Sequence, residues 1–123
     1  MVSFIDNFNG LDPTLWVVSD GYANGDRIYD ATWRAGNVVV NPVNGLLTLS
    51  VSPDSDPAAT RTYAAGEIKS VSSRYYYGTY SVSMQAAPEP GVISSFLLSA
   101  VSGDQIDIQL GYFGDQRRLY HNG

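Results

Sequence analysis

Short stretches in which apolar and polar residues alternate are the feature that most constrains this chain. The clearest one runs over residues 104–110, with Ile106, Ile108 and Leu110 at every second position. Successive side chains of a strand point to opposite faces, so this stretch predicts a strand with one apolar and one polar face. Comparable stretches recur at intervals of about ten residues. They predict further strands over residues 37–40, 46–51, 63–73, 76–85, 92–101 and 117–120.

Turn signals separate these stretches, among them Asn9-Gly10 and Asn44-Gly45. No window repeats apolar residues at helical spacing for more than a turn or two. The sequence therefore predicts an all-β chain, and its many short strands favour an antiparallel β-sandwich. Because no linker or internal repeat divides it, we expect a single domain over residues 1–123.

Charge and composition argue against several classes of partner. The net charge is -5, and the only adjacent basic pair is Arg117-Arg118, so we expect no nucleic acid partner. No apolar run is long enough to cross a membrane, and the start lacks the basic and apolar regions of a signal peptide. There is no cysteine, and His121 has no partner at metal-ligand spacing, so we expect no metal centre.

The polar face of residues 104–110 carries Gln105, Asp107 and Gln109 in a row, about 6.6 Å apart along the strand. Retaining glycosidases hold two carboxyl groups about 5–5.5 Å apart, and side chains at 105 and 109 can lean together to meet that distance. Both positions are glutamine here. An amide does not ionise near neutral pH, is a poor nucleophile and supplies no useful proton to a leaving alcohol. The alternative is that the alternation is ordinary sandwich patterning with no catalytic role.

Several blocks in order resemble glycoside hydrolase family 16, in particular bacterial lichenases and rhizobial exopolysaccharide glycanases. The resemblance implies a β-jelly roll of two curved antiparallel sheets, with a sugar-binding cleft along the concave face. Family domains are of about 200–250 residues, so the chain is expected to form a partial jelly roll, about the N-terminal half. The blocks that carry the resemblance are FNGLDPTLW, SDGYANG, TWRAGNV, GEIKS, YYYGTYSVSMQ, GVISSFLLS and DQIDIQ.

The resemblance also implies roles for the polar row. It assigns the nucleophile to position 105, a supporting aspartate to Asp107 and the acid/base to position 109. With Gln105 and Gln109 in the two catalytic places, we expect essentially no hydrolysis. Glutamine is nearly isosteric with glutamate, so a cleft of this kind would still hold sugar.

Other residues are expected to contact substrate on the same ground. Tyr22 and Asn24 match a sugar-touching loop, although SDGYANG is also an ordinary Asn-Gly turn. Glu67 matches an acidic cleft position, and Lys69 stands where the family often has an arginine, which loses the planar fork. Phe96 is either a stacking platform for a sugar ring or a core residue, and the sequence does not separate the two.

The resemblance further implies that Asn7 and Gly45 offer backbone carbonyls to a structural calcium. Another ligand would come from the part of the family domain that this chain does not include. We therefore expect weak or no calcium binding, and no other cofactor.

Three functions remain open. The first is a family 16 glycosidase acting on β-1,3/1,4-glucan or a related exopolysaccharide by retaining double displacement, made inactive by the glutamines. The second is a non-catalytic carbohydrate-binding module, and the third is a structural or engineered half-domain fragment. The resemblance implies a polysaccharide partner and an extracellular location. A half sandwich would also leave sheet edges open, from which we expect self-association.

Overall fold

The computed structural model describes residues 4–23, 25, 29–113 and 116–122, with side chains as far as residue 111. Within these residues the only helix is a 3-10 turn, η1 (Ala35–Asn37), and all other regular structure is strand, so the all-β prediction is confirmed. No helix in this part of the chain is long and apolar enough to span a bilayer. Two compact units are present, unit 1 (Met1–Gly78) and unit 2 (Thr79–Gly123), and each is described by itself. A single domain over residues 1–123 stays a prediction.

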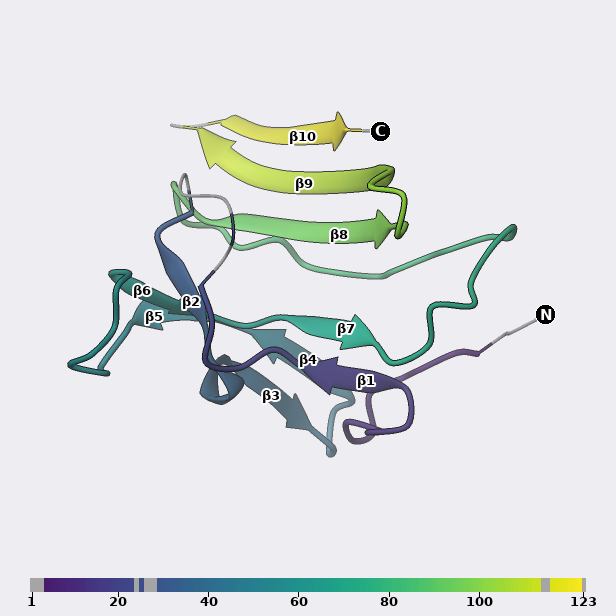
Figure 1. Cartoon of the computed structure of the whole chain (residues 1–123), viewed down its shortest axis with the longest axis horizontal. Helices are drawn as coiled ribbons and strands as arrows, with labels where there is room; N and C mark the ends of the chain where they lie inside the picture. The colour runs from purple at the N-terminus through teal and green to yellow at the C-terminus, as the bar shows by residue number, and fades with distance from the viewer. Residues whose placement is uncertain (1–3, 24, 26–28, 114–115, 123) are drawn as a thin grey trace. The chain divides into compact units, whose positions relative to one another are not determined.

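Unit 1 is built from small sheets that join distant parts of the sequence (Figure 1). The strand expected over residues 63–73 is broken into two, on either side of Gly66 and Glu67. The strands of unit 1 are β1 (Trp16–Val18), β2 (Ala31–Trp33), β3 (Val38–Asn41), β4 (Leu46–Leu49), β5 (Val51–Pro53), β6 (Tyr63–Ala65) and β7 (Ile68–Ser70). They pair as β1-β7, β2-β6-β5 and β3-β4.

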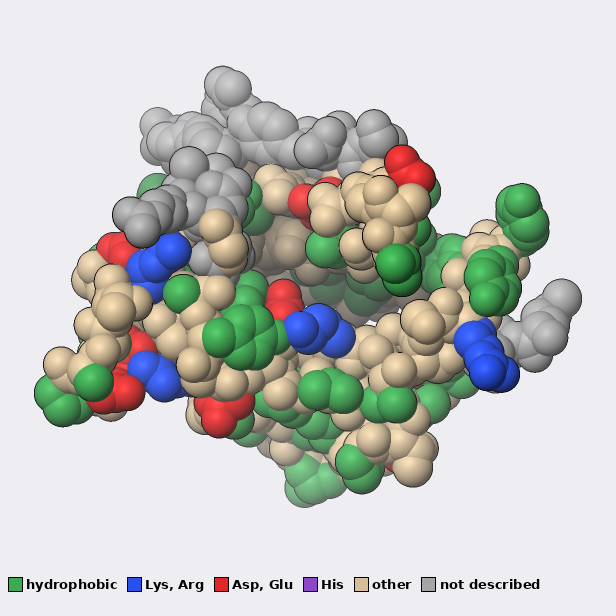
Figure 2. All heavy atoms as spheres, in the orientation of Figure 1, with side chains coloured by type: hydrophobic (Ala, Val, Ile, Leu, Met, Phe, Trp, Pro, Cys, Tyr) green, Lys and Arg blue, Asp and Glu red, His purple; other side chains and the backbone are tan. Residues whose placement is uncertain are grey.

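The β3–β4 hairpin follows from its sequence. Gly45 ends the turn with φ of 66°, a left-handed conformation that glycine adopts at little cost. Val38 pairs with Leu49 and Val40 with Leu47, so these apolar side chains share one face. Apolar side chains also lie at the surface over this hairpin (Figure 2).

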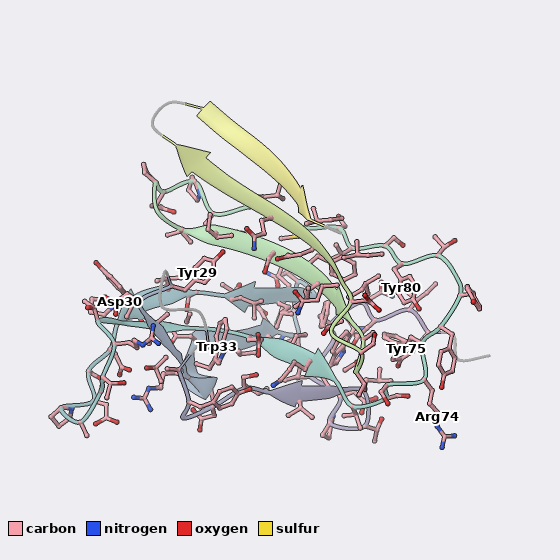
Figure 3. All side chains as sticks on the ribbon, turned by 45° about the horizontal axis from the view of Figure 1, so that its top comes forward. Tyr29, Asp30, Trp33, Arg74, Tyr75 and Tyr80 are labelled. Atoms are coloured by element: carbon pink, nitrogen blue, oxygen red, sulfur yellow. The ribbon has the colours of Figure 1, made fainter. Side chains whose placement is uncertain are left out.

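β2 and β6 run parallel, unlike the other pairs. Asp30, labelled at the start of β2 in Figure 3, holds the chain that leads into β6. Its Oδ1 accepts the Thr62 amide at 3.0 Å, and its carbonyl accepts the Tyr63 amide at 3.0 Å. Two bonds from one residue thus fix the register of the parallel pair.

Aromatic rings anchor the start of the chain to β1. Phe4 and Phe8 have ring centroids 5.8 Å and 6.2 Å from that of Trp16. The Asp6 carboxylate accepts the Trp16 indole N–H and the Phe8 amide, both at 2.7 Å. This segment is therefore fixed by one aspartate and by ring contacts.

The centre of unit 1 contains a buried polar side chain, Asn37, which is 7% exposed. Its amide donates to the Ser50 carbonyl at 3.2 Å and to Ser52 Oγ at 3.0 Å. Ala64, beside it in β6, is 4% exposed. Asn37 thereby joins the end of η1 to the strands β5 and β6.

Unit 2 is a three-stranded antiparallel sheet in the order β10-β9-β8. The strand predicted over residues 104–110 is confirmed and continues to residue 113, and those predicted over 92–101 and 117–120 are confirmed with shifted ends. A turn closed by Gly103, with φ of 95°, connects β8 to β9. The strands are β8 (Ile93–Ser99), β9 (Gln105–Phe113) and β10 (Gln116–Asn122).

The strand predicted over residues 76–85 is not formed. Alternation gives a segment an apolar face, but a strand also needs a neighbour that pairs with its backbone. No strand in the described residues pairs with this segment. Its apolar side chains are exposed, Val82 at 49% and Met84 at 40%.

Candidate functional site

The polar row on β9 is held in the middle of the sheet of unit 2. β9 has a neighbour on each side, so its backbone is fixed over its length. Directly opposite residues of an antiparallel pair point to the same face. Gln105, Asp107 and Gln109 therefore share one face with the residues opposite them on β8, which are Ser99, Leu97 and Ser95. The predicted grouping on one face is present.

Asp107 and Gln109 contact each other within this row. Gln109 Nε2 donates to Asp107 Oδ2 at 2.7 Å, which orients the Gln109 amide. The other carboxylate oxygen, Asp107 Oδ1, is buried and accepts no hydrogen bond from any described residue. An unsatisfied buried acceptor costs about 1–3 kcal/mol. A hydrogen-bond donor from a ligand would therefore be stabilising at Asp107 Oδ1.

Phe96 lies on the opposite face of this sheet. It pairs with Ile108, whose side chain points away from the face of Asp107. Of its two expected roles, packing on the apolar face agrees with this register. Stacking against a sugar held by the polar row does not.

In unit 1, three of the predicted contact residues come together on and near β7. Lys69 Nζ donates to Tyr22 Oη at 2.5 Å and lies 3.8 Å from Glu67 Oε1. Glu67 directly precedes β7 and is two residues from Lys69, and the two side chains contact each other. Asn24, the fourth residue expected in this group, lies outside the described residues.

Ser19 completes this group, although no pattern in the sequence singles it out as a site residue. Tyr22 Oη donates to Ser19 Oγ at 2.9 Å, and Ser19 Oγ donates to Glu67 Oε1 at 2.6 Å. A serine before Asp-Gly reads as a turn residue, and only the pairing of β1 with β7 brings it to Glu67. We name the four residues Ser19, Tyr22, Glu67 and Lys69 the β7 cluster.

The charges at its ends fix the direction of every hydrogen bond in the β7 cluster. A lysine ammonium only donates and a carboxylate only accepts. The two hydroxyl protons therefore point from Tyr22 to Ser19 and from Ser19 to Glu67. The bond to Tyr22, together with the charge of Glu67, raises the pKa of Lys69 above its ordinary value. Lys69 stays charged throughout the neutral range.

Asn7 and Gly45 lie together, as the calcium expectation requires. A side chain on Gly45 would place its Cβ 2.9 Å from the Asn7 carbonyl oxygen. Calcium takes about six to eight oxygen ligands. No group of three or more His, Cys, Asp or Glu suited to a metal occurs among the described residues. These residues alone do not complete a calcium site.

Comparison with known proteins identifies similar sequences and a similar fold. Residues 25–122 match the sequence model of the family described as Glycosyl hydrolases family 16. A beta-glucanase of Bacillus subtilis (strain 168) is 36% identical over 112 residues, which cover 87% of this chain and 43% of that protein. The endo-1,3-1,4-beta-glycanase ExoK of Rhizobium meliloti (strain 1021) is 37% identical over 94 residues, or 76% of this chain and 33% of that protein.

A solved structure agrees with this. The Bacillus licheniformis beta-glucanase matches with a TM-score of 0.67 and 27% identity over 94% of this chain and 60% of that chain. The expected β-sandwich of jelly-roll type, in partial form, is therefore confirmed. The chain spans less than half the length of the beta-glucanase and ExoK proteins that it matches.

Proposed function

Because this chain belongs to family 16 of the glycosyl hydrolases, we propose that it binds a β-1,3/1,4-glucan or a related exopolysaccharide without hydrolysing it. The observation that carries this proposal is the row Gln105, Asp107 and Gln109 on one face of β9. The family resemblance assigns positions 105 and 109 to the two carboxyl groups of a retaining glycosidase, and both positions hold amides here.

The chemistry explains why hydrolysis is lost. In a retaining reaction one carboxylate attacks the anomeric carbon while the other carboxyl group gives its proton to the departing oxygen. Water then releases the sugar from the first carboxylate. Gln105 offers no carboxylate for the attack, and Gln109 has no acidic proton and already donates its amide to Asp107. The attack on the anomeric carbon therefore lacks its carboxylate, and the departing oxygen lacks a proton donor.

Binding requires less of the row. Asp107 Oδ1 is a buried acceptor with no partner among the described residues, so a sugar hydroxyl would gain a hydrogen bond there. The β7 cluster supplies a further surface, because Tyr22 is 44% exposed and Lys69 carries more N–H groups than its bond to Tyr22 uses. An exposed aromatic ring beside a carboxylate and an ammonium suits a polyhydroxylated ligand.

We also propose an extracellular location, which follows from the expected polysaccharide partner, and self-association through sheet edges. The segment 76–85, which forms no strand and has exposed apolar side chains, supports the latter. The competing function, a structural half-domain that binds nothing, is favoured by the same exposed apolar residues. The two are separated by whether sugar binds.

The test measures binding and turnover on the same samples. We expect lichenan or laminarin to retard the protein in affinity electrophoresis, with no reducing sugar released above background. Glu67 and Glu89 are the only glutamates of the sequence, so Glu67→Gln and Glu89→Gln form a matched pair. Glu67→Gln should weaken binding about tenfold, the value of one charge-assisted hydrogen bond, and Glu89→Gln should not change it.

Two results would contradict the proposal. Turnover by the unmodified chain that disappears in Asp107→Ala would mean that another acid replaces the glutamines. Absence of binding to every β-glucan offered would leave the structural half-domain.

A further inference from the structure

Ser19 is one of the most deeply buried side chains of the described part of the molecule, at 2% exposure. A buried hydroxyl is costly unless both its donor and its acceptor functions are used. Ser19 uses both, accepting from Tyr22 at 2.9 Å and donating to Glu67 at 2.6 Å. It is therefore a fully satisfied link between two side chains that are themselves exposed or half-buried.

The backbone fixes where the Ser19 hydroxyl lies. Its amide donates to the Glu67 carbonyl at 3.1 Å, directly after the antiparallel pair formed by Val18 and Ile68. Ser19 is thus attached to β7 by its main chain as well as by its side chain. Rotation of its hydroxyl away from Glu67 would leave an unpaired buried group.

Tyr22 depends on this link. Its backbone carbonyl accepts the Trp33 amide at 2.8 Å, which ties the residue to β2. Its hydroxyl contacts Ser19, which directly follows β1, and Lys69 of β7. The orientation of the Tyr22 ring is consequently set by the contacts of its hydroxyl with Ser19 and Lys69.

We propose that Ser19 is a positioning residue whose hydroxyl holds Tyr22 Oη and Glu67 Oε1 in place. The Tyr22 ring and the Glu67 carboxylate are then already ordered when polysaccharide binds. Ser19 itself does not touch the sugar. The part of this inference that concerns sugar rests on the proposed function. Preorganisation of this kind strengthens binding because the side chains lose less freedom when the ligand arrives.

Lys69 gives a readout that does not require sugar. It is the only lysine of the sequence, so carbon-13 labelling of lysine gives one side-chain Cε signal to follow against pH. Its pKa is raised first by the bond to Tyr22 and then by Glu67. If Ser19 holds Tyr22 in place, Ser19→Ala should lower the pKa of Lys69 towards its ordinary value. A serine that only fills space would leave the pKa unchanged.

The experiment compares three variants with the unmodified chain in two assays, the Lys69 titration and the affinity for soluble lichenan. Ser19→Ala should lower the Lys69 pKa and weaken lichenan binding about tenfold. Ser19→Thr keeps the hydroxyl and should restore both in large part. Ser52→Ala is the matched control, because it removes a hydroxyl that bonds Asn37, away from the β7 cluster. It should change neither readout.

Tyr22→Phe keeps the test decisive if Ser19→Ala is unstable, because on its own it should lower the Lys69 pKa while leaving Ser19 in place. Tyr22→Phe removes the hydroxyl that links Ser19 to Lys69, and adding Ser19→Ala to it should lower the Lys69 pKa no further. An unchanged Lys69 pKa in folded Ser19→Ala, or an equal change in Ser52→Ala, would overturn the inference. If the unmodified chain does not bind lichenan but Ser19→Ala still lowers the Lys69 pKa, the proposed function is overturned and the positioning role of Ser19 stands.

Discussion

Among the single residues of unit 1, Arg34 has the densest set of charged contacts. Its Nε and Nη2 donate to Asp54 Oδ2 at 3.0 Å and 2.9 Å, and Nη2 also lies 3.2 Å from Asp56. The Asp54 side chain is 4% exposed. The bond from Arg34, followed by the bond from the Asp56 amide, holds the pKa of Asp54 below its usual value. Arg34 is the residue that makes a nearly buried carboxylate acceptable here.

This contact predicts a pH dependence of stability. The unfolded Asp54 carboxyl keeps its ordinary pKa and so takes up a proton at higher pH than the folded one. Its contribution to the free energy of unfolding is complete above that ordinary pKa and is lost as pH falls through the lowered pKa. Asp54→Asn should therefore lower the urea midpoint at neutral pH and have little effect in acid.

The control for that measurement is Asp104→Asn, in the turn before β9, where the described residues provide a bond from Ser102 and no ion pair. It should shift the midpoint much less at neutral pH. A loss in Asp54→Asn that is equal at neutral and acid pH would mean that the carboxylate charge is not what stabilises the fold.

At the scale of elements, Gly66 lies between β6 and β7, against the backbone of η1. A Cβ at this position would lie 2.3 Å from the Asn37 carbonyl oxygen, a contact that real side chains do not make. The chain passes so close to Asn37 because the Gly66 amide donates to the Ser50 carbonyl at 3.2 Å. The close approach of two backbones, and not the flexibility of a turn, requires glycine here.

Gly66→Ala should consequently lower the free energy of unfolding by about 1–3 kcal/mol, the usual effect of forcing atoms into a packed centre. Gly36→Ala is the matched control, because no atom lies within 4 Å of a Cβ built there. Thermal melts of the two variants measure the difference. Equal melting temperatures would show that Asn37 moves aside at no cost.

The elements also show how far a sequence pattern predicts structure. Residues 104–110 were predictable because β9 has a neighbour on both sides, so its apolar alternation is matched by pairing. Residues 76–85 have the same alternation and no partner strand in the described chain, and alternation cannot reveal that. The face of Phe96 depends on its register with Ile108, and the place of Ser19 on a pairing with β7. Both are non-local, so neither leaves a trace in the nearby sequence.

Exposed apolar side chains dominate the behaviour expected of the whole molecule. On the segment 76–85, which forms no strand, Tyr77 is fully exposed at 102%, and Val82 and Met84 are half exposed. Burial of apolar surface contributes about 25 cal/mol per Å², so a few hundred Å² is a strong drive to associate. We expect dimers or larger species whose share rises with concentration.

Sedimentation velocity over a wide concentration range measures this. Val82→Lys places a charge on the segment and should reduce association, since charges protect strand edges. Val43→Lys adds the same charge at another exposed valine, in the β3–β4 turn, and should have less effect. A concentration-independent monomer would mean that the segment 76–85 drives no association.

The pairing of β1 with β7 has a consequence for how unit 1 is made. Trp16 lies opposite Ser70, more than fifty positions later, whereas β3 and β4 are joined by a short turn. Closing so long a loop is slow and entropically unfavourable, while a hairpin forms within microseconds. During synthesis β1 emerges before β7 and cannot pair until all of β7 has been made. The hairpin is thus the part of unit 1 that can pair as soon as it is made, whereas β1 stays without its partner strand until β7 follows.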